Sequence, residues 1–133
     1  MKKLTLLLFV VILLAACQPA SPPAPVEALA GSIDDLVGTW WFAKVGLMEF
    51  KSDGTYQVYV GSPDRGLIQS GNYTFESGKV SLPGCPEGSA VYEAFITKQE
   101  GKPVSLRMQV LGSDPCEDRA ELFASDTGKF YNP

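Results

Sequence analysis

The chain has 133 residues, of which 11 are lysine or arginine and 15 are aspartate or glutamate, so its formal net charge at pH 7 is −4. This acidic balance gives no electrostatic basis for binding nucleic acid or an anionic lipid surface. The chain also has no histidine, the most common general base and metal ligand. We therefore predict a protein that is not an enzyme and that has no catalytic residues, metal site or cofactor.

The first sixteen residues predict an export signal. Lys2 and Lys3 form a positive start, and residues 4–14 are apolar apart from one threonine. A transmembrane helix needs about 20 apolar residues, whereas the apolar core of a secretory signal peptide has this shorter length. Two alanines then precede Cys17, as small residues do at a cleavage site. We predict that residues 1–16 are removed as a signal peptide.

Residues 14–17, Leu-Ala-Ala-Cys, resemble the bacterial lipobox, whose cysteine receives a diacylglyceryl group. The resemblance implies that Cys17 is the lipid-attachment residue and that the protein lies outside the cytoplasm in the cell envelope. Two or three acyl chains anchor a protein stably, so the membrane contact is expected through the lipid. Gln18 is not the aspartate of an inner-membrane retention signal, which favours the outer membrane in a cell that has one. The alternative is an ordinary secretory signal.

Residues 17–31 are predicted to be a tether. The segment 18–31 contains four prolines and has few residues that could pack in a core. At about 3.1 Å per residue, such a proline-rich segment reaches roughly 40 Å.

Residues 32–126 predict one small all-β domain, and residues 127–133 a C-terminal tail. Ser32 begins a short capped helical turn, and short alternating runs then follow between glycine, aspartate and proline turns. Consecutive strands joined by tight turns favour an eight-stranded antiparallel up-and-down barrel, with a two-sheet sandwich as the alternative. The predicted strands are residues 39–45, 47–51, 54–60, 67–76, 79–82, 90–99, 103–111 and 119–124.

The turns between these strands predict their register. Ser77-Gly78 fits a two-residue hairpin turn, and residues 52–54 supply a second turn. Both hairpins then carry apolar pairs on one face, which is expected to point inward. The predicted pairs are Phe75–Val80, Tyr73–Leu82, Phe50–Tyr56 and Met48–Val58.

A third turn at Glu100-Gly101 pairs residues whose numbers sum to 201. This register places Phe95 on the inward face, and it places Glu93 there too, opposite Met108. A buried carboxylate is costly unless it is paired, so Glu93 is expected at the barrel mouth, in an internal pair, or as the polar anchor of a small cavity.

The residue numbers of Cys85 and Cys116 also sum to 201, so continuing the same strand pairing brings the two cysteines together. In an oxidising compartment a disulfide is the expected state, with two free thiols as the alternative. Zinc is disfavoured, because two cysteines without histidine leave too few ligands. We interpret the acids beside Cys116, among them Asp114 and Asp118, as a solvated loop.

Gly38-Thr39-Trp40, directly before the first predicted strand, resembles the Gly-x-Trp motif of lipocalins and their calycin relatives. Arg119 is similar to the lipocalin arginine that packs over this tryptophan. The resemblance implies a lipocalin-like barrel whose closed end is formed by Trp40 and Arg119, with a ligand-binding function. Small barrel inhibitors of secreted proteases share the general pattern.

The resemblance and the inward residues lead to two functional hypotheses. The first is an anchored lipocalin-like module that binds a small apolar or amphipathic ligand. The second is a protein-binding or protease-inhibitor-like barrel, which has a filled core and contacts an envelope protein through its loops. The candidate cavity residues are Glu93, Tyr56, Tyr73, Phe95 and Met108.

Overall fold

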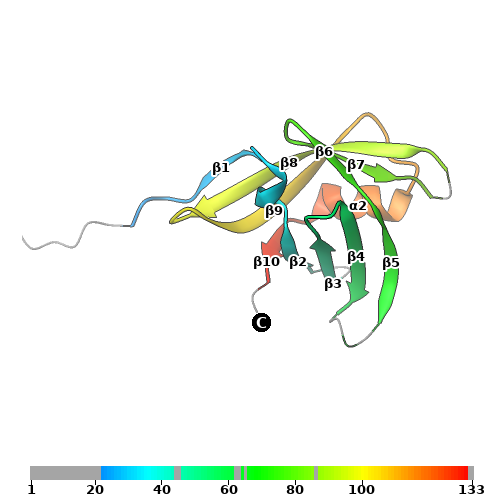
Figure 1. Ribbon diagram of the computed structural model, residues 1–133, viewed down its shortest axis with the longest axis horizontal. Coiled ribbons are helices and arrows are strands. Elements are labelled where there is room, and N and C mark those ends of the chain that lie inside the picture. Colours follow the sequence, from blue (N-terminus) through cyan, green and yellow to red (C-terminus); the bar gives the residue numbers. More distant parts are fainter. Residues whose placement is uncertain (1–21, 44–45, 62–63, 65, 86, 132–133) are drawn as a thin grey trace, which may run out of the picture.

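The structure is a computed structural model that describes residues 22–131, except 44–45, 62–63, 65 and 86 (Figure 1). The predicted signal peptide and the predicted lipid-attachment residue Cys17 lie outside the described residues. The described chain forms an antiparallel, nearly closed β-barrel with one α-helix.

The described residues contain ten strands, a short 3-10 turn and one helix, where the sequence predicts eight strands. Their bounds are β1 Val26–Leu29, η1 Ile33–Asp35, β2 Gly38–Phe42, β3 Gly46–Phe50, β4 Thr55–Val60, β5 Leu67–Asn72, β6 Thr74–Glu76, β7 Lys79–Pro83, β8 Ser89–Gln99, β9 Lys102–Leu111, α2 Glu117–Ser125 and β10 Gly128–Phe130.

The barrel is brought near to closure by one bent segment. The strands follow the order β5-β4-β3-β2-β10-β9-β8-β7-β6, with β1 added to β8. Only Tyr73 separates β5 from β6, so the predicted strand 67–76 exists but bends, and Figure 1 shows this continuous ribbon. Its first half pairs with β4 and its second half with β7. The two ends of the sheet therefore belong to the same stretch of chain.

Two strands were not predicted. β1 lies within the predicted tether and pairs with β8 from Val26 opposite Lys98 to Leu29 opposite Phe95. β10 lies within the predicted tail and fills the space between β2 and β9. Both are short and mostly exposed. They therefore lack the alternating pattern of a half-buried strand, and main-chain pairing defines them.

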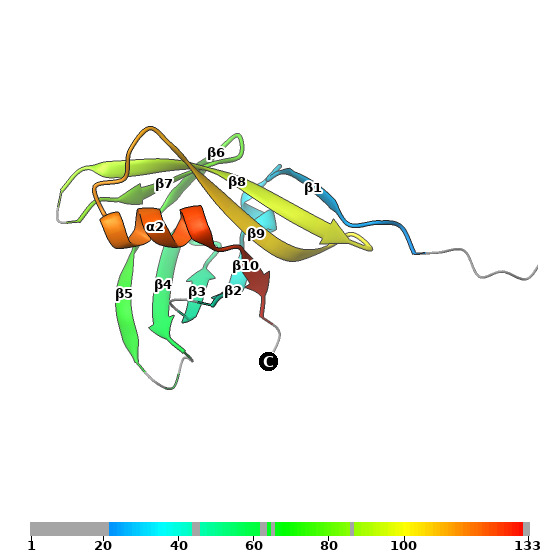
Figure 2. The ribbon, with the colours of Figure 1, turned by 180° about the vertical axis from the view of Figure 1, so that it is seen from behind.

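The prediction of a strand at 119–124 is wrong, because this segment lies in helix α2. Figure 2 shows the helix lying across one opening of the barrel. Arg119, Leu122 and Phe123 recur at the spacing of one helical face, and the last two are buried. Two acids in the first turn, Glu117 and Asp118, are favourable at a helix N-terminus.

Three of the four predicted pairs in the first two hairpins are confirmed: Phe75–Val80, Phe50–Tyr56 and Met48–Val58. The predicted Tyr73–Leu82 pair is absent from the ladder, because β6 begins at Thr74. The tight turn is also confirmed, since Ser77 and Gly78 have φ angles of 50° and 80°. Consecutive positive φ angles are characteristic of a two-residue hairpin turn of type I′.

The predicted register of β8 and β9 holds only next to their turn. Gln99 pairs with Lys102, whose numbers sum to 201, but the register shifts by one residue between Thr97 and Lys98. Beyond this bulge, Ala94 faces Met108 and the numbers sum to 202. A one-residue shift turns every side chain of a strand to the other face. The buried residues of β8 are therefore Ala90, Tyr92, Ala94 and Ile96.

The inward positions predicted for Glu93 and Phe95 are therefore wrong. Glu93 pairs with Gln109 instead of Met108 and lies on the outer face. Phe95 lies on the same face, and the Cζ atom of Arg107 is stacked over its ring, 4.2 Å from the ring centroid. The structural reason for both corrections is the bulge, which the composition of the strands does not reveal.

Candidate functional site

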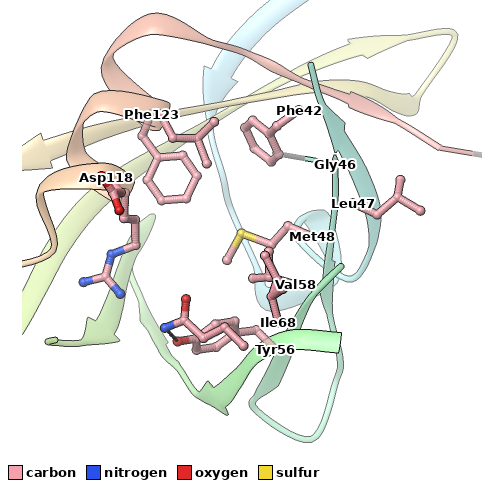
Figure 3. A pocket seen from close by; sticks show the side chains of 12 residues that line it. Phe42, Gly46, Leu47, Met48, Tyr56, Val58, Ile68, Asp118 and Phe123 are labelled. Carbon is pink, nitrogen blue, oxygen red and sulfur yellow. Dashed lines mark hydrogen bonds between the residues drawn. The ribbon is translucent and has the colours of Figure 1, made fainter. Parts of the chain in front are cut away.

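A cavity of about 290 Å³ opens between helix α2 and strands β3, β4 and β5 (Figure 3). Phe123 and Phe42 lie on one side of it, and Tyr56 and Ile68 on the opposite side. Most of its wall is apolar, and the polar groups lie together near the start of α2. Its lining residues are Phe42, Gly46, Leu47, Met48, Tyr56, Val58, Ile68, Gln69, Asp118, Arg119, Leu122 and Phe123.

Strand β4 supplies the floor of the cavity through the inward residues of its alternating pattern, Tyr56 and Val58. Gly71 on the neighbouring strand allows the Tyr56 ring to lie close to the backbone. A Cβ atom at position 71 would approach the Tyr56 ring to 2.9 Å. The small residue on β5 therefore positions the largest polar side chain of the cavity.

Tyr56 is the polar group at the floor of this cavity. Its side chain is buried, and its hydroxyl accepts a hydrogen bond from Gln69 Nε2 at 3.0 Å. Burial raises the pKa of Tyr56, and the nearby groups of Arg119 and Gln69 only partly oppose this effect. Tyr56 therefore keeps its proton at neutral pH.

Arg119 is held in place by a buried ion pair. Its Nε and Nη2 atoms donate to the two carboxylate oxygens of Asp114, each at 2.7 Å, and its Nη1 donates to the Pro83 carbonyl at 2.7 Å. The Asp114 side chain has no exposed surface, and that of Arg119 is 10% exposed. The charge of Arg119 is thus largely neutralised before any ligand arrives.

Two further donors complete the environment of Asp114. Tyr92 donates its hydroxyl proton to the carboxylate, and the backbone N–H of Cys116 donates at 2.8 Å. Burial opposes ionisation of Asp114, but hydrogen bonds from Arg119, Tyr92 and Cys116 outweigh it and lower its pKa. Burial, followed by the hydrogen bond to Asp114, raises the pKa of Tyr92. Asp114 is therefore ionised and Tyr92 neutral at neutral pH.

The structure brings Cys85 and Cys116 together with the geometry of a disulfide, as the sequence predicts. Cys85 and Cys116 are joined with an S–S distance of 2.06 Å and a Cα–Cα distance of 5.2 Å. Cys116 is also the N-cap residue of α2. The bond therefore ties the start of the helix to the loop that follows β7.

The structure separates most of the predicted cavity residues. Of the five, only Tyr56 lines this cavity. Tyr73 packs edge-on against Phe50, with ring centroids 5.0 Å apart, and its hydroxyl donates to the Lys51 carbonyl. Met108 is buried and borders a smaller hollow between α2 and β9. Glu93 and Phe95 lie on the outer face, as described above.

The predicted contact between Trp40 and Arg119 is wrong. Trp40 is fully buried, its Nε1–H donates to the Leu36 carbonyl at 2.8 Å, and its ring packs edge-on against Phe130 at 5.0 Å. Arg119 instead binds Asp114 and Pro83 at the cavity wall. Residue 119 lies in helix α2, whose first residue follows the disulfide-bonded Cys116, and not in a strand beside Trp40. Phe130 of β10 occupies the position next to Trp40 instead.

Sequence reasoning missed four site residues: Asp114, Gln69, Asp118 and, in its actual role, Arg119. Asp114, interpreted as a solvated acid, instead has a side chain with no exposed surface. For Asp114 the sequence offers only a position two residues before a cysteine expected in a disulfide, which does not by itself predict burial. For Gln69, on a mostly exposed strand, the sequence offers no signal.

Within the described ranges no cluster of three or more potential metal ligands occurs. No helix in this part of the chain is both long and apolar enough to cross a membrane. Comparison with known proteins finds no matching family model, no curated protein of significant similarity and no solved structure of significant similarity.

Proposed function

We propose that the protein is a lipid-anchored binding module of the cell envelope, with a lipocalin-like barrel that takes a small, mainly apolar ligand. The observation that carries this proposal is the cavity under α2. A volume of about 290 Å³ far exceeds the share of one water molecule, about 30 Å³ in the liquid. It lies just below the usual range for small-molecule sites, about 300–1,000 Å³, so it suits a compact ligand. The cavity therefore favours a ligand-binding module over a barrel with a filled core.

The anchoring part of the proposal rests on the sequence around Cys17, and the lipocalin-like part on Gly38-Thr39-Trp40 at the start of β2. The tryptophan is buried where β2 pairs with β10, which we call the barrel seam, and this is compatible with the resemblance. Membrane-anchored binding modules keep their ligand near the membrane surface, and a cavity on a tethered domain suits that task.

The rival function, protein binding through the loops, has one supporting observation. Three large apolar side chains are exposed at the ends of β4 and β5: Val60, Leu67 and Ile68, at 48%, 50% and 57%. Exposed apolar groups that lie together are typical of contact surfaces. Only Ile68 of the three also lines the cavity, so variants at neighbouring positions can separate the two functions.

The test uses the full mature chain and an apolar fluorescent probe. Ile68→Trp places a large ring at the cavity wall, and we expect it to reduce probe binding at least tenfold. Leu67→Trp adds the same ring at the neighbouring position, outside the cavity lining, and should leave probe binding unchanged. If both variants bind the probe as tightly as the original chain, the probe does not bind in the cavity, and the cavity no longer supports the proposed function. Loss of binding in both variants would favour the exposed apolar surface.

A further inference from the structure

The cavity contains a hydrogen-bond donor, the Tyr56 hydroxyl, for which the described residues provide no acceptor. The Tyr56 hydroxyl accepts from Gln69 Nε2 at 3.0 Å, and the guanidinium of Arg119 lies close enough to act on it as well. Its own proton must then point to another oxygen or nitrogen, and none of the described side chains or backbone groups receives it. A phenol that accepts from a neighbouring donor becomes a stronger donor itself.

The charges around the cavity argue against a charged ligand. Arg119 is matched by Asp114, and three of its five N–H groups are already used. The remaining charge at the wall is the carboxylate of Asp118 (Figure 3), which repels anions. A cation would find only this exposed, solvated carboxylate as a partner, so burying its charge against the apolar wall would cost hydration without a buried counter-charge. An uncharged acceptor avoids both unfavourable interactions.

The size of the cavity limits the rest of the ligand. Its volume equals about ten water molecules, which leaves room for roughly ten non-hydrogen atoms. The opposite wall is formed by Phe42, Phe123 and Leu122, which offer only apolar surface. One end of the ligand is therefore polar and the other apolar.

We propose that the ligand is an uncharged, compact apolar molecule with one carbonyl-type oxygen, which accepts the proton of Tyr56. The ketone, ester and amide classes share this chemistry. The inference rests on the proposed function, because it names the class of ligand for the same cavity.

The test compares four ligands of one length, measured by calorimetry on the full mature chain: octane, octan-2-one, octanoate and octylamine. We expect octan-2-one to bind about two- to tenfold more tightly than octane, the gain of one buried hydrogen bond of about 0.5–1.5 kcal/mol. Octanoate and octylamine should bind more weakly than octan-2-one. Tightest binding of octanoate or octylamine would overturn the proposed class.

Two variants assign the preference to Tyr56. Tyr56→Phe should remove the advantage of octan-2-one over octane while octane binding is retained. Tyr59→Phe is the matched control, because Tyr59 lies on the same strand and its hydroxyl donates to Gln57 outside the cavity. An unchanged ketone advantage in Tyr56→Phe would contradict the inference. Thermal unfolding of both variants checks that they fold.

The outcomes also separate this inference from the function on which it rests. If none of the four ligands binds, the proposed cavity function fails. If all four bind with equal affinity, the cavity function stands and the inferred class fails. As a second check, Asp118→Asn removes the repelling carboxylate and should improve octanoate binding more than octan-2-one binding.

Discussion

Both carboxylate oxygens of Asp114 accept hydrogen bonds from one guanidinium, that of Arg119, five residues further along the chain. The pair joins the loop after β9 to the first turn of α2. Because Arg119 also binds the Pro83 carbonyl, the same side chain fixes the helix to the end of β7. The position of α2, and with it one wall of the cavity, therefore depends on this pair.

Removing one partner of the pair should be strongly destabilising. Asp114→Ala leaves a buried guanidinium without its counter-charge, and we expect the free energy of unfolding to fall by about 3–5 kcal/mol. Urea unfolding measures the loss. The double variant with Arg119→Met should lose less than the sum of the two single variants, because no lone buried charge remains. Asp118→Ala, at an exposed residue of the same helix, is the control and should lower stability by no more than about 1 kcal/mol, the contribution of a carboxylate at a helix N-terminus. Additive losses in the double variant would contradict a coupled pair.

The same pair predicts a pH dependence of stability. The pKa of Asp114 is lowered in the folded protein from its ordinary value of 3.8. A group of this kind contributes its stability above the unfolded pKa and loses it as pH falls through the folded pKa. The free energy of unfolding should therefore decrease as the pH falls below about 4. Asp114→Asn should be less stable than the original chain at pH 7, and the gap should narrow at low pH. A gap that stays constant down to pH 2 would show that Asp114 does not titrate in this way.

The close contact at the start of β10 gives a third prediction. A Cβ atom on Gly128 would approach the Phe42 ring to 2.6 Å. Gly128→Ala should therefore force the ring to move and lower the free energy of unfolding by about 1–3 kcal/mol, as overpacking does. At Gly31 the nearest atom to a new Cβ would lie 3.6 Å away, so Gly31→Ala is the matched control. Thermal unfolding compares the two variants, and equal midpoints would argue against tight packing at this seam.

The lipid anchor is tested by Cys17→Ala in the full chain. We expect the variant to lose labelling by a radioactive fatty acid and to leave the membrane fraction, either as a soluble protein or as an uncleaved precursor. Cys85→Ser together with Cys116→Ser is the control, since it removes the other two cysteines of the chain and should retain labelling. Labelling that persists in Cys17→Ala would refute the lipoprotein proposal.

The sequence predicted best those features that depend on local chemistry. The turn at Ser77-Gly78 and the apolar pairs of β3 and β4 were predicted because turn residues and alternation act over a few positions. The faces of β8 were predicted wrongly, because a single bulge next to Lys98 reverses them. No residue type marks such a bulge in advance, and the candidate cavity around Glu93 was lost with it.

The site itself depends on contacts between distant segments. Tyr56 was predicted to face inward, and the disulfide was predicted from the cysteine count and the compartment. The burial of Asp114 could not be read in the same way, because it follows from the meeting of the disulfide loop, Tyr92 and Arg119. A carboxylate among polar neighbours in sequence looks solvated until the tertiary structure encloses it.

The seam closed by β10 also has a consequence for the order of folding. Phe130 pairs with Trp40, which is 90 positions earlier in the chain. The contact between the first and last barrel strands therefore cannot form until almost the whole chain is available. Such distant pairing is slow to form, because the loop entropy is lost before the contact is gained. A chain that crosses a membrane unfolded would keep this barrel open through its passage and close it only once Phe130 has emerged to pair with Trp40.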